Sequence, residues 1–228
     1  MAVIEVTGVG HRYPGSERQV LSQVSVRLTE QRVGVIGANG SGKSTFARLL
    51  NGLVLPADGK VTVDGLDTRR NGKAVRRQVG FCFTDPDAQI VMPTVAEDIG
   101  FGLRRRGLSR QEVSDRVRAA LSTYGLEGHA DHPAHLLSGG QKQLLALAAV
   151  LVTEPKVLVM DEPTTLLDLR NARMIGRVVA DLSQQVVLVT HHLELLEDFD
   201  RVLVFDEGRL VLDSTPGEAI TYYRKLMS

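Results

Sequence analysis

Short runs of apolar, β-branched residues alternate with turn-forming residues along much of the chain. Residues 3–7 and 24–28 alternate apolar and polar side chains, which is typical of a half-buried antiparallel hairpin. Continuous apolar runs indicate more deeply buried strands at residues 33–36, 78–83, 157–162 and 185–190. Further strands are predicted at 60–65, where a turn follows, and as a hairpin at 201–205 and 209–212. The pattern predicts an α/β fold with an antiparallel β subdomain at its N-terminus.

A helical segment is predicted after the strand at 78–83, because no strand-like run interrupts residues 93–153. Ser109 and Glu112 match a capping box that opens a helix ending near Tyr124. Other helices are expected from Thr45, from Pro93, over 144–152, from Asp168 to about Ser183, and after Thr215. We expect one folding unit, with a core of about residues 1–83 and 156–228 and an inserted α-helical subdomain of about 84–155.

Composition narrows the function classes. Lysine and arginine together number 27, as do aspartate and glutamate. The chain therefore has no net positive charge that would attract nucleic acid. The basic runs 69–70 and 104–106 are interpreted as solvated surface. Cys82 is the single cysteine and is expected to be buried. Neither a signal peptide nor an apolar stretch long enough for a membrane span is found, so we expect neither secretion nor membrane insertion.

Residues 37–45 carry the pattern G-x-x-x-x-G-K-[ST] directly after the apolar run 33–36, in the order strand, loop and helix. Glycines let successive backbone N–H groups point at phosphates, and the helix adds the positive end of its dipole. This predicts binding of ATP or GTP rather than a chance glycine-rich turn. The candidate nucleotide-binding residues are Gly37, Asn39, Gly40, Ser41, Gly42, Lys43, Ser44 and Thr45, with Lys43 on the β and γ phosphates and Ser44 on Mg²⁺.

Three other positions carry candidate chemistry for hydrolysis. Asp161 and Glu162 end a buried strand, where ligands bind in parallel sheets. We assign Mg²⁺ to Asp161 and activation of the attacking water to Glu162, with a salt-bridging acidic turn as the alternative. His191 ends the next strand and could hold the γ-phosphate, although histidines there are often surface residues. Tyr13 could stack on adenine or simply pack at the surface.

Residues 136–141 place a second glycine pair at the start of a second helix, which makes either a second anion-binding end or a simple Ser138 N-cap. Nearby, His129, His132 and His135 recur at every third residue. Pro133 would break any helix that aligned them, and no cysteine or carboxylate completes a zinc site. We therefore interpret this stretch as an ordinary loop and assign no metal.

The order of these motifs resembles the ABC ATPase family over nearly the whole chain. The resemblance implies a P-loop NTPase (RecA-like) core that hydrolyses ATP with Mg²⁺. It identifies residues 37–45 as Walker A, 157–162 as Walker B with its catalytic glutamate, His191 as the switch histidine and Tyr13 as the adenine-stacking ring. The signature is assigned to Leu137, Ser138, Gly139, Gly140 and Gln141, and the D-loop to 165–168 with Asp168. In this family two copies pair head to tail, so each signature would close over the partner's ATP; a homodimer is expected.

Residues 83–101 are most similar to the ATPase of energy-coupling factor (ECF) importers, and the short C-terminus to those for biotin, cobalt or nickel. This implies a peripheral subunit at the cytoplasmic face of the cell membrane, with a transmembrane coupling protein and a small substrate-binding membrane protein as partners. Biotin is our first choice of substrate. One position departs from the family: Thr84 stands where a glutamine normally contacts Mg²⁺, so either Thr84 through water or Gln89 would have to serve.

Two other function classes compete with a transport ATPase. A soluble ABC protein acting on DNA or ribosomes would need a coiled-coil insertion or a second cassette, and the sequence has neither heptads nor a repeat. A phosphate-loop kinase acting on a small metabolite would leave the motif at 137–141 without a role.

Overall fold

The computed structural model describes residues 1–104 and 106–228 and divides them into two compact units. The first unit contains residues 1–81, 156–162 and 182–228, and the second contains 82–155 and 163–181. Arg105, the middle residue of the basic run 104–106, lies outside the described residues. The flanking Arg104 and Arg106 are exposed, as are Arg69 and Arg70. The two units are described separately below.

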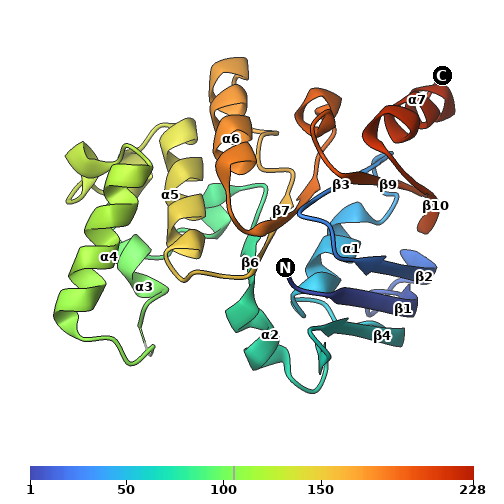
Figure 1. Ribbon diagram of the computed structural model, residues 1–228, viewed down its shortest axis with the longest axis horizontal. Helices are drawn as coiled ribbons and strands as arrows, with labels where there is room; N and C mark the ends of the chain where they lie inside the picture. Colours follow the sequence, from blue (N-terminus) through green and yellow to red (C-terminus); the bar gives the residue numbers. More distant parts are fainter. Residues whose placement is uncertain (105) are drawn as a thin grey trace. The chain divides into compact units, whose positions relative to one another are not determined.

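An antiparallel sheet in the first unit has the strand order β2-β1-β4-β5 (Figure 1). Its strands are β1 (Ile4–His11), β2 (Leu21–Leu28), β4 (Asp58–Val63) and β5 (Leu66–Asp67). The register pairs Ile4 with Leu28 and with Val63, so the apolar side chains of three strands share one face. The predicted N-terminal hairpin is confirmed. The strand predicted at 60–65 belongs to this antiparallel sheet.

A six-stranded sheet in the same unit has the order β10-β9-β3-β8-β7-β6. Its strands are β3 (Arg32–Gly37), β6 (Val79–Cys82), β7 (Val157–Asp161), β8 (Gln185–Val189), β9 (Arg201–Asp206) and β10 (Arg209–Ser214). The pairs β3–β8, β3–β9 and β7–β8 are parallel, and β9–β10 is the predicted antiparallel hairpin. Every residue of β3, β7 and β8 is buried, which explains why these strands read as continuous apolar runs.

Three α-helices belong to the first unit: α1 (Lys43–Leu50), α2 (Gly72–Gln78) and α7 (Pro216–Leu226). Helix α1 contacts β3, β7 and β8, and its Phe46 ring lies 4.9 Å from that of Phe205 in the buried core. Helix α2 was not predicted, because its seven residues bury only Val75 and therefore leave almost no apolar periodicity. Helix α7 begins at Pro216 as expected, but the Thr215 side chain makes no capping hydrogen bond.

The second unit is helical in all its regular structure, apart from the last residue of β6 and one isolated bridge. Its α-helices are α3 (Val95–Phe101), α4 (Arg110–Thr123), α5 (Gly139–Leu151) and α6 (Leu169–Asp181). Helix α3 packs against both α4 and α5 (Figure 1). Reciprocal capping boxes open α3 at Thr94, α4 at Ser109 and α5 at Ser138. The helical segment and the start of α4 at Ser109 are confirmed, whereas the helix predicted over 144–152 begins earlier, at Gly139.

The boundary between the units differs from the prediction for residues 163–181, which were expected in the core. This segment belongs to the helical unit, where α6 packs against α5. Ala172, Ile175 and Val179 are the buried residues of α6. Among the described residues, no helix combines the length and apolar character needed to cross a membrane. Cys82 is free and buried, as predicted, and burial raises the pKa of its thiol to about 12.

The capping box of α4 gives a test of local stability. Ser109 Oγ accepts a hydrogen bond from the Glu112 N–H, and Glu112 Oε2 accepts one from the Ser109 N–H at 2.7 Å. Because the exchange of an N-cap serine for alanine leaves an orphan donor, Ser109→Ala should lower the free energy of unfolding by about 1 kcal/mol. The matched control is Ser122→Ala, at an exposed position in the same helix. Urea unfolding measures both, and equal stability of the two variants would contradict the capping assignment.

Candidate nucleotide-binding and catalytic site

The glycine-rich loop of residues 37–42 leaves the carboxyl end of β3 and turns directly into α1. Gly37 has φ +152°, and a Cβ atom there would lie 2.1 Å from the Phe205 carbonyl oxygen on β9. Gly42, the N-cap of α1, has φ +99°, and its Cβ would lie 2.7 Å from the Val20 carbonyl oxygen. Backbone therefore encloses the loop at both ends, and only glycine fits these two positions.

Lys43 is buried at the first position of α1 and turns its side chain back toward the loop. Its Nζ donates hydrogen bonds to the carbonyl oxygens of Gly37 at 2.7 Å and Ala38 at 2.9 Å. Burial lowers the pKa of Lys43, and the negative charges of Glu162 and Asp161 oppose that shift. The lysine thus places a cation inside the loop, within the electrostatic reach of both carboxylates.

Asp161 ends β7 and is almost completely buried beside α1. Ser44 Oγ donates a 2.8 Å hydrogen bond to Asp161 Oδ1, and Arg48 Nη2 lies 3.5 Å from Oδ2. Burial raises the pKa of Asp161, while Ser44 and Arg48 act in the opposite direction. The two residues that the sequence analysis assigned to Mg²⁺, Ser44 and Asp161, are therefore in direct contact.

Glu162 follows β7 directly and has φ +53°, a left-handed conformation that is strained for a non-glycine residue. Its N–H donates to the Val189 carbonyl oxygen at 2.9 Å, which fixes the backbone against β8. Its carboxylate Oε2 lies 2.6 Å from His191 Nδ1. The strained turn directs Glu162 to His191 while Asp161 faces Ser44, so the two adjacent carboxylates have different partners.

Tyr13 lies just beyond β1, and its hydroxyl is 3.1 Å from Thr45 Oγ1 on α1. Its ring meets that of His11 edge to face, with centroids 4.8 Å apart. About a third of the Tyr13 surface remains exposed (37%). Tyr13 is thus tied to the first turn of α1, beside the glycine-rich loop, with part of its surface open to solvent.

The motif at 137–141 lies in the helical unit. Ser138 is the N-cap of α5: its Oγ accepts from the Gln141 N–H at 3.4 Å, and Gln141 Oε1 accepts from the Ser138 N–H at 2.9 Å. Leu137 and Gly140 are buried, whereas Ser138 and Gly139 are exposed. A Cβ atom on Gly140 would lie 2.5 Å from the Asn171 side chain of α6. The N-cap interpretation of Ser138 is confirmed, and the anion-binding interpretation stays a prediction.

Asp168 lies at the start of α6, where its carboxylate accepts a 2.8 Å hydrogen bond from the Asn171 N–H. It is exposed, like its neighbours Leu166 and Leu169. Its local role is therefore to cap α6, with its remaining oxygen open to solvent.

Gln89 was offered as a replacement for the missing glutamine at Thr84, and its amide is already used inside the helical unit. Gln89 Oε1 accepts from the Phe83 N–H at 3.1 Å, and Nε2 donates to the Ala146 carbonyl oxygen at 2.9 Å. A move of Gln89 onto a metal would break both bonds. The structure therefore disfavours Gln89 as a ligand and gives it the role of fastening the loop after β6 to α5.

Residues 21–165 match the family described as ABC transporter. The chain belongs to this family. ABC transporter ATP-binding subunits are ATPases coupled to transport, and so is this chain.

Two curated relatives and one solved structure are similar over most of this ABC ATPase. The biotin transport ATP-binding protein BioM of Rhizobium etli is 49% identical over 209 residues, 92% of this chain and 93% of its own length. The energy-coupling factor transporter ATP-binding protein EcfA1 of Caldanaerobacter subterraneus is 38% identical, over 95% of this chain and 82% of its own. The structure of cbiO1 from Clostridium perfringens, part of the ABC transporter complex cbiONQ, has a TM-score of 0.84 at 31% identity, covering 98% of this chain and 92% of that one.

The residues of the loop fit ATP. The first turn of α1 contains no acidic residue, and its N-cap is a glycine, so its N–H groups receive no side-chain cap. The Ser41 hydroxyl is buried and has no hydrogen-bond partner among the described residues. With the Lys43 ammonium, these donors suit the phosphates of a nucleotide. Ser44 Oγ and the Asp161 carboxylate are the hard oxygen ligands that Mg²⁺ prefers.

Two arginines at the site were missed by the sequence interpretation. Arg48 contacts Asp161, and Arg18 Nη2 donates to the Gly40 carbonyl oxygen at 3.3 Å. The i, i+4 spacing of Ser44 and Arg48 on one helix was a usable signal, because it places both side chains on the same face. Arg18 carries no such signal, since it lies in the loop between β1 and β2 and reaches Gly40 only in the folded chain.

Gly42→Ala tests whether the loop needs its enclosed backbone. The new Cβ would meet Leu21 Cδ2 at 2.6 Å and the Val20 carbonyl oxygen at 2.7 Å, at a φ of +99°. We expect a loss of about 1–3 kcal/mol in the free energy of unfolding, the cost of such strain, and weaker ATP binding. The matched control is Gly65→Ala, which has φ +77° with open space around its Cβ. Urea unfolding and fluorescent-nucleotide titration measure both; equal affinity in the two variants would contradict this assignment.

Proposed function

We propose that this chain is the ATP-hydrolysing subunit of an ECF-type importer, most similar in its task to biotin importers. The proposal is based mainly on two side-chain contacts that lie close together, at the ends of the neighbouring strands β7 and β8. Ser44 meets Asp161 beside the loop lysine, and Glu162 meets His191 next to them. The names of the BioM, EcfA1 and cbiO1 relatives support the ECF assignment.

The geometry supports a division of roles in hydrolysis. Bound Mg²⁺ would supply positive charge that neutralises the phosphates. Ser44 and Asp161 are the residues that would hold it. Glu162 would accept a proton from the attacking water, and His191 would orient Glu162 and hold the γ-phosphate. The 2.6 Å contact between Glu162 Oε2 and His191 Nδ1 supports this role, because it fixes the carboxylate that receives the proton.

A second copy of the chain is the partner that we propose for closure over ATP. The exposed Ser138 hydroxyl and Gly139, at the amino end of a 13-residue helix, can present donors to a partner's γ-phosphate. Asp168 and the exposed Leu166 and Leu169 would face the partner from the start of α6. ATP would favour the closed pair, and hydrolysis through Glu162 would reopen it.

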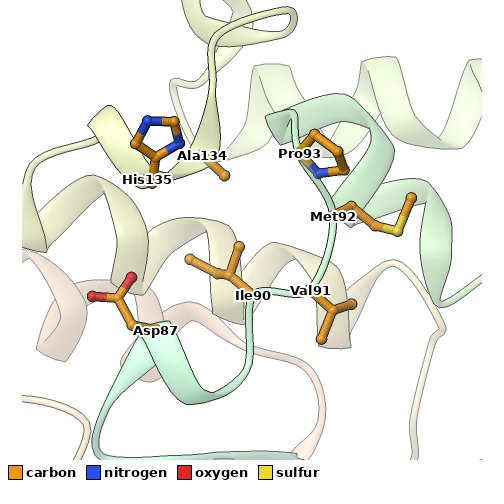
Figure 2. Close-up of a pocket in the computed structure, with 7 residues that line it drawn as sticks. All are labelled: Asp87, Ile90, Val91, Met92, Pro93, Ala134 and His135. Carbon is orange, nitrogen blue, oxygen red and sulfur yellow. The ribbon is translucent and has the colours of Figure 1, made fainter.

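The membrane partners would be a transmembrane coupling protein and a small substrate-binding membrane protein, with this chain peripheral at the cytoplasmic face. A pocket of about 300 Å³ within the helical unit suits a short apolar helix of the coupling protein (Figure 2). It is lined by Asp87, Ile90, Val91, Met92, Pro93, Ala134 and His135. Val91, in the lining of this pocket, is 61% exposed and offers an apolar surface for such a helix to cover.

Glu162→Gln tests the catalytic assignment. The amide keeps the size of the side chain but cannot accept the proton, so kcat for ATP hydrolysis should fall by about 10²–10⁴. ATP binding should remain, and the variant should accumulate as an ATP-dependent dimer, seen by light scattering. The control is Glu197→Gln, at an exposed position beyond the site. Normal hydrolysis by Glu162→Gln would remove Glu162 from this role.

Val91→Asp tests the membrane partnership. An unpaired charge on the apolar side of the pocket in Figure 2 should prevent an apolar helix from docking there, unlike Asp87, which is paired with Lys142. The integral proteins should then be lost when the tagged chain is purified from membranes. ATP binding by the isolated chain should be unchanged. Val211→Asp, on the exposed edge of β10, is the matched control. Retention of the same membrane proteins by both variants would refute this docking site; the small molecule that co-purifies with the wild type decides between biotin and cobalt or nickel.

A further inference from the structure

His129 and His132 lie beside the start of α5, in the loop that precedes the motif at 137–141. His129 Nδ1 is 2.7 Å from His132 Nδ1, and His129 Nε2 is 2.9 Å from Gln141 Nε2. The two rings meet at 64° with centroids 4.8 Å apart. Both ring nitrogens of His129 are therefore occupied, one by the neighbouring histidine and one by the last residue of the motif.

The capping box fixes the direction of this chain of hydrogen bonds. Gln141 Oε1 accepts from the Ser138 N–H, so the amide group at Gln141 Nε2 must donate to His129. His129 Nε2 must then be the acceptor, which places its proton on Nδ1. That proton is donated to His132 Nδ1, so His132 carries its own proton on Nε2. Each imidazole therefore has a defined tautomer in this arrangement.

The backbone holds the histidines in place. The His129 N–H donates to the Leu126 carbonyl oxygen and the His132 N–H to the His129 carbonyl oxygen, each at 2.9 Å. The His132 carbonyl oxygen accepts from the N–H of Val95, the first residue of α3. The hydrogen bonds that link His132, His129 and Gln141 therefore connect a loop bonded to α3 with the N-cap of α5.

We propose that the His129–His132 pair positions Gln141 and thereby sets the orientation of the motif at 137–141 that presents Ser138. Gln141 is a flexible amide whose two ends could exchange. An acceptor at His129 Nε2 stabilises the same amide orientation that the Ser138 N–H requires, with Gln141 Oε1 toward Ser138 and Nε2 toward His129. His129 and His132 are positioning residues and make no contact with the nucleotide in this proposal. The expected effect on turnover rests on the function proposed above for this motif. The predicted tautomers are independent of that function.

The first experiment measures the tautomers directly in the full-length wild-type chain, labelled with ¹⁵N at histidine. Long-range ¹H–¹⁵N correlation spectra at pH 8 should show His129 protonated on Nδ1, the less populated tautomer of free histidine, and His132 protonated on Nε2. Loss of the corresponding signals in His129→Gln and His132→Asn assigns them. A His129 ring protonated on Nε2 would overturn the proposal, whether or not the chain hydrolyses ATP.

The second experiment compares two replacements of His129. Phenylalanine keeps the planar ring but offers no acceptor, so His129→Phe should lower kcat about five-fold, the effect of one lost neutral hydrogen bond. His129→Gln offers an amide oxygen to Gln141 Nε2 and should stay within about two-fold of the wild type. ATP affinity should be unchanged in both, because the glycine-rich loop belongs to the other unit.

Equal kcat values for the two variants, whether normal or reduced, would overturn the positioning role. Circular dichroism melting of both variants shows whether each is folded. If His129→Phe is not folded, the tautomer measurement on the wild type tests the proposal instead. A wild-type chain without ATPase activity would count against the proposed function alone, because the spectra would still test the hydrogen-bond chain.

Discussion

The alignment of three parallel strands is the constraint on which the first unit depends. In the sheet register Val35 of β3 and Asp161 of β7 both pair with Val189 of β8. Strands β7 and β8 end at this level, and β3 continues to Gly37. The candidate functional groups lie at or just after these strand ends. The glycine-rich loop leaves β3, Asp161 ends β7 with Glu162 directly after it, and His191 follows β8. The 2.8 Å bond from Ser44 to Asp161 and the Glu162 N–H on Val189 join the ends laterally.

The backbone packs closely at this edge of the sheet, and Glu162 there has a strained conformation. Gly37 and Gly42 are enclosed by backbone carbonyl groups of Phe205 and Val20, and Glu162 adopts a left-handed conformation without being glycine. Such strain persists only where surrounding contacts hold it. Here a 2.9 Å backbone hydrogen bond and the contact with His191 hold Glu162, so the two adjacent carboxylates serve separate partners.

In the helical unit, capping hydrogen bonds position the functional motif, as the strand register does in the sheets. Three reciprocal capping boxes start α3, α4 and α5, and in α5 the same residues also form the motif at 137–141. The capping hydrogen bonds that stabilise the helix end therefore also order Ser138 and Gln141. The His129–His132 pair adds a further contact to Gln141, which couples the preceding loop to the same helix start.

The sequence by itself determined the strands, the capped helices and the main motifs, because apolar periodicity, glycine spacing and capping boxes act over a few neighbouring residues. Only the tertiary structure placed α6 in the helical unit, used both ends of the Gln89 amide, and brought Arg18, His129 and His132 to their partners. These contacts join side chains whose meeting depends on how elements pack and how loops return. No local pattern encodes that geometry, which is why the sequence predicted candidate residues for the site but not all of their partners.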